Sequence, residues 1–178
     1  MPIRVTILLL IPLIVLMSLN DAYAQSKKER TFKSKMGDVQ ITFPGVSKVD
    51  YKDYFETAQF KSGKPLFIIQ VKEIPSLNEI ESMGGNEAYA LAELNNFMRS
   101  VGADFQNPSI SPWRVKAYSG HQAEFFSKTY KINYQYRVIV VDSVICHVYV
   151  SVDNVSMESR AEFNEKENKA FFKSFKVK

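Results

Sequence analysis

The residues with the most obvious chemical potential are a cysteine and a histidine that are adjacent in the chain. Cys146 is the only cysteine among 178 residues, and His147 is one of two histidines. A thiolate activated by a neighbouring imidazole is a common nucleophile, so the pair raises the question of an enzyme. The stretch 144–152 is rich in β-branched residues and predicts a strand. Because successive strand residues point to opposite faces, we expect the two side chains not to meet.

This alternation predicts that Cys146 is an unreactive core residue. It shares its strand face with valines at 144, 148, 150 and 152, and apolar surroundings raise the pKa of a thiol. His147 should lie on the other face, with Ile145 and Tyr149. Both faces are apolar, so we expect the sheet to be covered on both sides.

The remaining polar residues do not form a recognisable catalytic or metal-binding pattern. His121 follows a turn glycine, and we interpret it as a solvated loop side chain with no metal ligand at a suitable spacing. Asp50, Asp53 and Glu56 lie three apart in an extended segment and cannot share one face, so we expect surface charges. No catalytic, cofactor-binding or metal-binding residue is predicted.

Three residues are candidates for an interaction surface. Arg137 is a cation within a β-branched strand, where we expect a salt bridge to Glu124 and consider a ligand contact as the alternative. Trp113 and the loop at Asn107 could form an exposed rim, since large aromatic rings often anchor interfaces. The alternative for Trp113 is a ring packed at the sheet edge.

The order of hydrophobic patterns predicts an α+β fold with a mainly antiparallel sheet of about six to seven strands flanked by helices. An amphipathic helix is expected over 86–101, and a charged helix from about residue 157 to 173. Pro44-Gly45 and Asp142-Ser143 are expected to be turns, and Gly84-Gly85 should end a short helix. The predicted strands are 39–43, 51–60, 66–74, 113–118, 122–130, 134–141 and 144–152.

The amino-terminal residues predict export. Residues 1–24 have a short basic start, an apolar run shorter than the roughly 20 residues that a spanning helix needs, and Ala22-Tyr23-Ala24 as a cleavage signal. We therefore expect cleavage between Ala24 and Gln25 and a periplasmic or secreted product without a transmembrane segment. Residues 25–36 are interpreted as a basic flexible leader, and 37–178 as a single domain.

The charge of the chain is mildly basic. The formal net charge is +4 and the pI is about 9.0, with Lys and Arg spread through the sequence. This excess is mild, and the expected export argues against nucleic acid as a partner.

The arrangement of several motifs resembles the PsbP-like family. After the signal peptide come "GDVQITFPG" at 37–45, a central helix, "YSGHQAEFF" at 118–126, "YQYRVIVVDSVICHVYVSV" at 134–152 and "FFKSFKV" at 171–177. The resemblance implies an antiparallel sheet between helix layers, a fold shared by photosystem II accessory subunits and by a nuclear-transport protein that binds a Ran-type GTPase. No functional residue of the family is carried over.

These observations favour an exported, non-catalytic accessory or binding protein of the cell envelope that contacts an unidentified envelope protein. The alternatives are a small-ligand carrier with a pocket between helix and sheet, or an enzyme whose site is assembled from distant residues. No cofactor is expected.

Overall fold

The computed structural model describes residues 27–74, 76–103, 108–153 and 165–178. The predicted signal peptide, Asn107 and the first part of the helix expected from residue 157 lie outside these residues. Within them, no helix is both long and apolar enough to cross a membrane.

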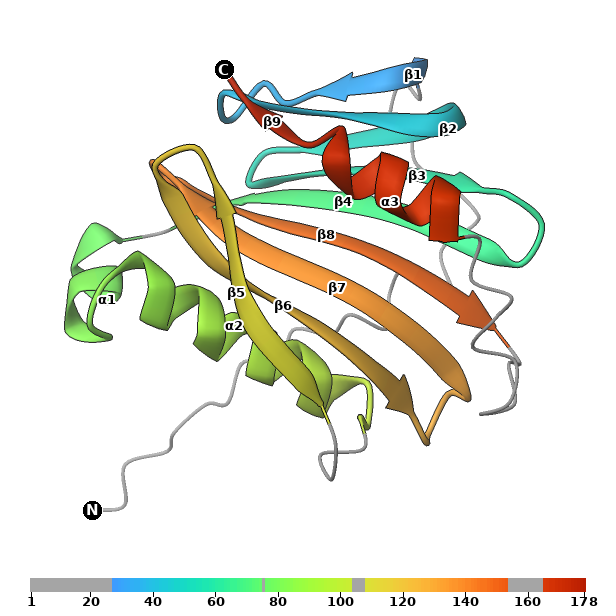
Figure 1. Ribbon diagram of the computed structural model, residues 1–178. Coiled ribbons are helices and arrows are strands. Elements are labelled where there is room, and N and C mark those ends of the chain that lie inside the picture. The colour runs from blue at the N-terminus through green and yellow to red at the C-terminus, as the bar shows by residue number, and fades with distance from the viewer. Residues whose placement is uncertain (1–26, 75, 104–107, 154–164) are drawn as a thin grey trace, which may run out of the picture.

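The described residues contain nine strands that form one antiparallel sheet, so the predicted α+β class is confirmed with more strands than expected (Figure 1). The strand order is β1-β2-β3-β4-β8-β7-β6-β5, and β9 pairs with β2. The strands are β1 (Lys27–Lys33), β2 (Val39–Lys52), β3 (Phe55–Lys61), β4 (Pro65–Glu73), β5 (Ser109–Val115), β6 (Tyr118–Ser127), β7 (Ile132–Val141), β8 (Val144–Asp153) and β9 (Lys176–Val177).

The two additional strands are β1 and β9. Residues 27–33, expected to belong to a flexible leader, instead pair with β2 from Lys27↔Val49 to Lys33↔Gln40. The charged sequence of β1 did not indicate a strand. It is compatible with one because β1 lies at the sheet edge, where lysines are tolerated and discourage further pairing.

Strand β2 also differs from the prediction because it continues through Pro44-Gly45, which was expected to be a turn. The pairing register to β1 jumps between Thr42 and Ser47, so these residues form a bulge. A Cβ on Gly45 would lie 2.4 Å from the Phe60 ring, so this glycine permits close packing. The expected strand 51–60 is in fact divided by a turn between β2 and β3.

The helices cover opposite faces of the sheet. α1 (Leu77–Ser82) leads into α2 (Asn86–Ser100), which packs on β6 and β7, whereas α3 (Glu165–Lys173) packs on β2. Gly84 and Gly85, both with positive φ, separate α1 from α2 as predicted.

The sheet therefore has two separate cores. The α2 face packs an aromatic cluster that includes Phe125, Tyr134, Tyr136 and Tyr149. The α3 face packs the valines of β8 against three phenylalanines of the carboxyl-terminal segment, Phe171, Phe172 and Phe175. This arrangement places every other residue of β8 in each core, as the alternation predicts.

Candidate functional site

The Cys146–His147 pair is divided between the two cores. Cys146 is fully buried among the valines of the α3 face, which confirms the predicted core position. Burial, with a smaller effect of the Glu56 carboxylate, raises the pKa of the Cys146 thiol. A protonated, inaccessible thiol is not a nucleophile at neutral pH.

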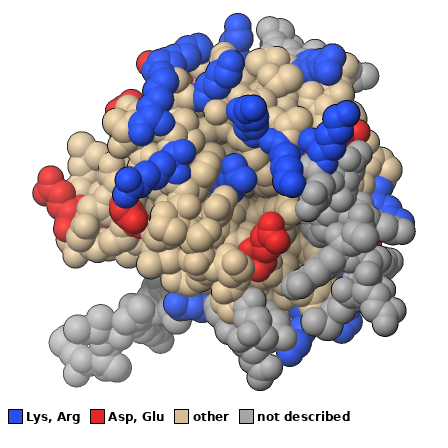
Figure 2. All heavy atoms as spheres, viewed as in Figure 1, with Lys and Arg blue, Asp and Glu red and all other residues tan. Residues whose placement is uncertain are grey.

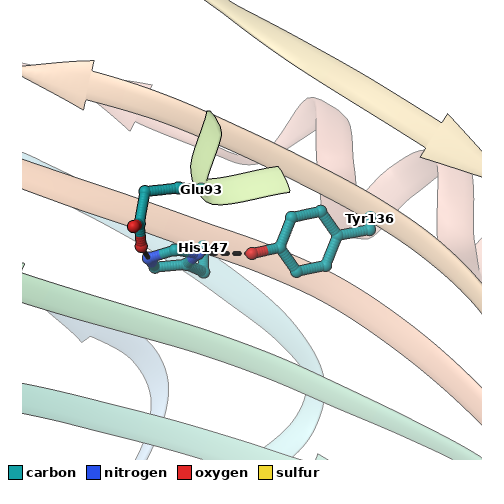
Figure 3. Close-up of polar contacts among 3 residues, drawn as sticks. All are labelled: Glu93, Tyr136 and His147. Carbon is teal, nitrogen blue, oxygen red and sulfur yellow. Dashed lines mark hydrogen bonds and ion pairs between the residues drawn. The ribbon is translucent and has the colours of Figure 1, made fainter. Parts of the chain in front are cut away.

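His147 joins a polar network under α2 (Figure 3). Its Nδ1 is hydrogen-bonded to the Tyr136 hydroxyl, and its Nε2 lies 3.9 Å from Oε2 of Glu93 on α2. Burial, assisted by Lys72, lowers the pKa of His147 to about 3, so the imidazole is neutral at neutral pH and the Glu93 contact is not an ion pair. When Tyr136 donates to Nδ1, the neutral ring carries its proton at Nε2, toward Glu93.

The Glu93–His147–Tyr136 arrangement has the order of residues seen in catalytic relays, but a substrate could not reach the Tyr136 hydroxyl. Tyr136 is only 1% exposed, and burial raises its pKa well above 10. The Phe97 ring of α2 stacks on Tyr136 with 4.3 Å between ring centroids. The hydrogen bond between Tyr136 and His147 therefore pairs two polar groups buried between helix and sheet, and the Tyr136 hydroxyl is inaccessible from solvent.

His121 lies in a different environment from the predicted one. It belongs to β6, its side chain is 12% exposed, and its Nε2 lies 3.9 Å from Oε1 of Glu87 on α2. The prediction of a solvated loop side chain is wrong because β6 begins at Tyr118, which turns His121 toward α2. The described residues contain no group of His, Cys, Asp and Glu that could hold a metal ion.

Glu56 also differs from the prediction of a surface charge. It is 2% exposed, and its carboxylate accepts a hydrogen bond from Ser34 Oγ at 2.5 Å and another from the Lys35 backbone N–H at 3.0 Å. These bonds join the β1–β2 connection to β3. Glu56 is therefore a structural carboxylate.

The α3 face contains an accessible groove of about 380 Å³ between α3 and the edge strand β5. Four cations line it: Arg114, Arg137, Lys169 and Lys173. No Asp or Glu is among the described lining residues. We call this feature the cationic groove. In Figure 1, β5 passes in front of β6, on the same side of the sheet as α3. Residues 113–115 of β5 line one side of the groove.

Arg137 lies in the groove with its guanidinium against aromatic rings. The guanidinium carbon is 4.2 Å from the Phe172 ring centroid and 5.4 Å from that of Trp113. Burial lowers the pKa of Arg137 to about 10, against an opposing effect of the Glu124 carboxylate, and the group stays charged at neutral pH. Glu124 acts on Arg137 electrostatically while its Oε1 accepts a hydrogen bond from Gln135 Nε2 at 3.2 Å.

The Trp113 ring is packed in the protein and is largely buried from solvent. Its side chain belongs to the α3-face core, the residue is 8% exposed, and its ring centroid is 5.2 Å from that of Phe175. This is the sheet-edge alternative considered for Trp113. Trp113 and Arg137, two of the three candidate residues, thus meet in one groove, whereas Asn107 lies outside the described residues.

Helix α3, which forms one wall of the groove, carries one lysine beyond the two that line it. Lys166, Lys169 and Lys173 recur at helical spacing on α3 and are exposed, opposite the phenylalanines that face the sheet. Figure 2 shows Lys and Arg gathered over α3 and toward the β1–β2 side of the molecule. The helical spacing of the lysines could be recognised in the sequence. Their proximity to Arg114 and Arg137 could not, because β5, β7 and α3 are far apart in the chain.

Neither a protein-family model nor a curated protein matches this chain.

Proposed function

We propose that the protein is an exported, non-catalytic binding protein of the cell envelope, and that its cationic groove holds an anionic part of a protein partner. The observation that carries the proposal is Arg137, a partly desolvated cation fixed against two aromatic rings in an accessible groove with three further cations. A partly buried charge is stabilised when an opposite charge approaches, so an anionic group is the natural occupant.

Two expectations from the sequence support this proposal. The predicted signal peptide directs the chain to the envelope, and the resemblance to the PsbP-like family favours an accessory role. Amino-terminal sequencing of protein extracted from the envelope tests export, and a chain that begins at Gln25 is the expected result.

A small-ligand carrier is the second candidate, because about 380 Å³ lies within the range of small-molecule sites. The groove has a cationic rim, so the corresponding ligand would be a small carboxylate or phosphate compound.

The test is capture of envelope proteins by the tagged mature chain, with quantitative mass spectrometry. The groove variant is Arg137→Gln/Lys173→Gln, and the control is Lys33→Gln/Lys48→Gln, which removes the same charge from exposed residues on strands β1 and β2. Partners retained by the wild type and control but lost by the groove variant support the proposal. Capture that is identical for all three proteins contradicts it.

A further inference from the structure

We infer that the partner presents an extended acidic segment, whose carboxylates pair with Arg137 and the α3 lysines without adding a strand to β5. This inference rests on the proposed function and specifies the chemistry of the groove's occupant.

The first argument is the preparation of Arg137 for a carboxylate. Contact with Phe172 and Trp113 restricts the planar guanidinium before any ligand arrives. A guanidinium donates two parallel hydrogen bonds to a carboxylate, and little side-chain entropy is lost when the group is already held. Arg137 is therefore the expected anchor.

The second argument is spacing along the helix wall of the groove. Lys169 and Lys173 are four residues apart on α3, which corresponds to about 6 Å along a helix axis. Alternate residues of an extended chain are about 6.6 Å apart and point to the same side. A segment with acidic residues at alternate positions therefore matches the two lysines.

The third argument excludes backbone pairing as the main contact. β5 is an edge strand, and among the described strands it pairs only with β6. It contains Pro112, which has no backbone N–H, and the N–H of Ile110 is already bonded to the Pro108 carbonyl at 3.1 Å. A proline in an edge strand discourages strand addition. Recognition must then come from side chains.

The shape of the site argues against a membrane surface as the occupant. Arg137 lies in a groove, and the phenylalanines of α3 point into the core, so a flat bilayer would meet the lysines without reaching the guanidinium. A projecting chain segment reaches both.

Trp113 provides an internal probe, because it is the only tryptophan in the chain and it lines the groove. The experiment titrates the mature protein with a hexapeptide that alternates Glu and Ala and follows Trp113 fluorescence. The matched peptide has Gln in place of Glu. We expect saturable binding of the Glu peptide alone, weakened by added salt.

The variants identify the contacts. Arg137→Gln should weaken binding at least about tenfold, and Arg137→Lys should recover part of the loss because it keeps the charge but not the paired donors. Glu124→Gln should tighten binding, since it removes the carboxylate that opposes an incoming one. Lys33→Gln/Lys48→Gln should change the affinity less than about twofold.

Several outcomes would overturn the inference. These are equal binding of the Glu and Gln peptides, unchanged binding by Arg137→Gln, or a tenfold gain with Pro112→Ala, which would indicate strand addition. Binding of free glutamate or inorganic phosphate as tight as that of the peptide, or preferential binding of phosphatidylglycerol vesicles, would do the same. If these occur while envelope capture still depends on the groove, the proposed function stands without this partner chemistry.

Discussion

The two faces of the sheet treat their polar groups in opposite ways. On one face, Tyr136 and His147 are hydrogen-bonded to each other and covered by the 15-residue helix α2. On the other face, the nine-residue helix α3 packs on β2, and Arg137 of β7 lies in a groove beside it. The comparison teaches that burial of polar residues alone does not identify a binding site; the polar group that lines an accessible groove is the informative one.

The charges of the helices follow the same division. The α1–α2 segment, residues 77–100, contains Glu79, Glu81, Glu87 and Glu93 against the single cation Arg99, whereas the segment from 165 to 178 contains five lysines against two glutamates. This difference in charge between the two segments favours the α3 face as the side that the proposed anionic partner would approach.

The largest expected effect tests whether the two cores are equally necessary for folding. Phe171→Ala removes a ring whose centroid lies 5.2 Å from those of both Phe43 and Phe67, and Leu94→Ala opens a cavity under α2. We expect each to lower the free energy of unfolding by about 2–5 kcal/mol, as large core truncations do. Urea denaturation followed by circular dichroism measures both. A loss below about 1 kcal/mol for Phe171→Ala would mean that α3 contributes little to the fold.

The second prediction concerns acid and the α2 face. The pKa of His147 is about 3 in the folded protein and near 6.5 when unfolded, so the unfolded state binds more protons between these values. Stability from this residue is therefore present above pH 6.5 and is lost as the pH falls toward 3, with a slope of at most about 1.4 kcal/mol per pH unit. The measurement compares wild type with His147→Gln, which should have a flatter profile. Parallel profiles would show that His147 does not resist protonation.

A smaller effect is expected at Cys146, on the α3 face. Cys146→Ala should cost about 1 kcal/mol in stability, and a thiol reagent should label Cys146 only after the protein is denatured. Mass spectrometry of labelled protein at increasing urea concentration measures this. Rapid labelling without urea would contradict the buried position.

The smallest effect on stability is expected at Arg137, where the effect on binding should be largest. Arg137→Met keeps an apolar contact with Phe172 and removes a partly desolvated charge, so stability should stay within about 0.5 kcal/mol of wild type or rise. Thermal melting measures stability, and Trp113 fluorescence measures binding of the Glu peptide. A strongly destabilised Arg137→Met protein would assign Arg137 a structural role like that of Glu56.

Local patterns predicted some side chains correctly and misplaced others. The positions of Cys146 and His147 followed from strand alternation in a long β-branched stretch, where the boundary does not affect the result. His121 was misplaced because its environment depends on where β6 begins. Glu56 was misplaced because its partners, Ser34 and Lys35, belong to the segment that was predicted to be a flexible leader. The sequence did not show that this segment follows a strand and packs beside β3.

The sequence by itself determined the α+β class, the antiparallel hairpins and the two-sided alternation of β8, because periodicity and turn residues act over short distances along the chain. The cationic groove exists only because of the tertiary structure. Trp113, Arg137 and Lys173 come from β5, β7 and α3, and they meet because β5 lies on the same side of the sheet as α3 and the phenylalanines of the carboxyl-terminal segment hold α3 against it. Such contacts depend on sheet curvature and on the position of helix packing, which no local pattern specifies.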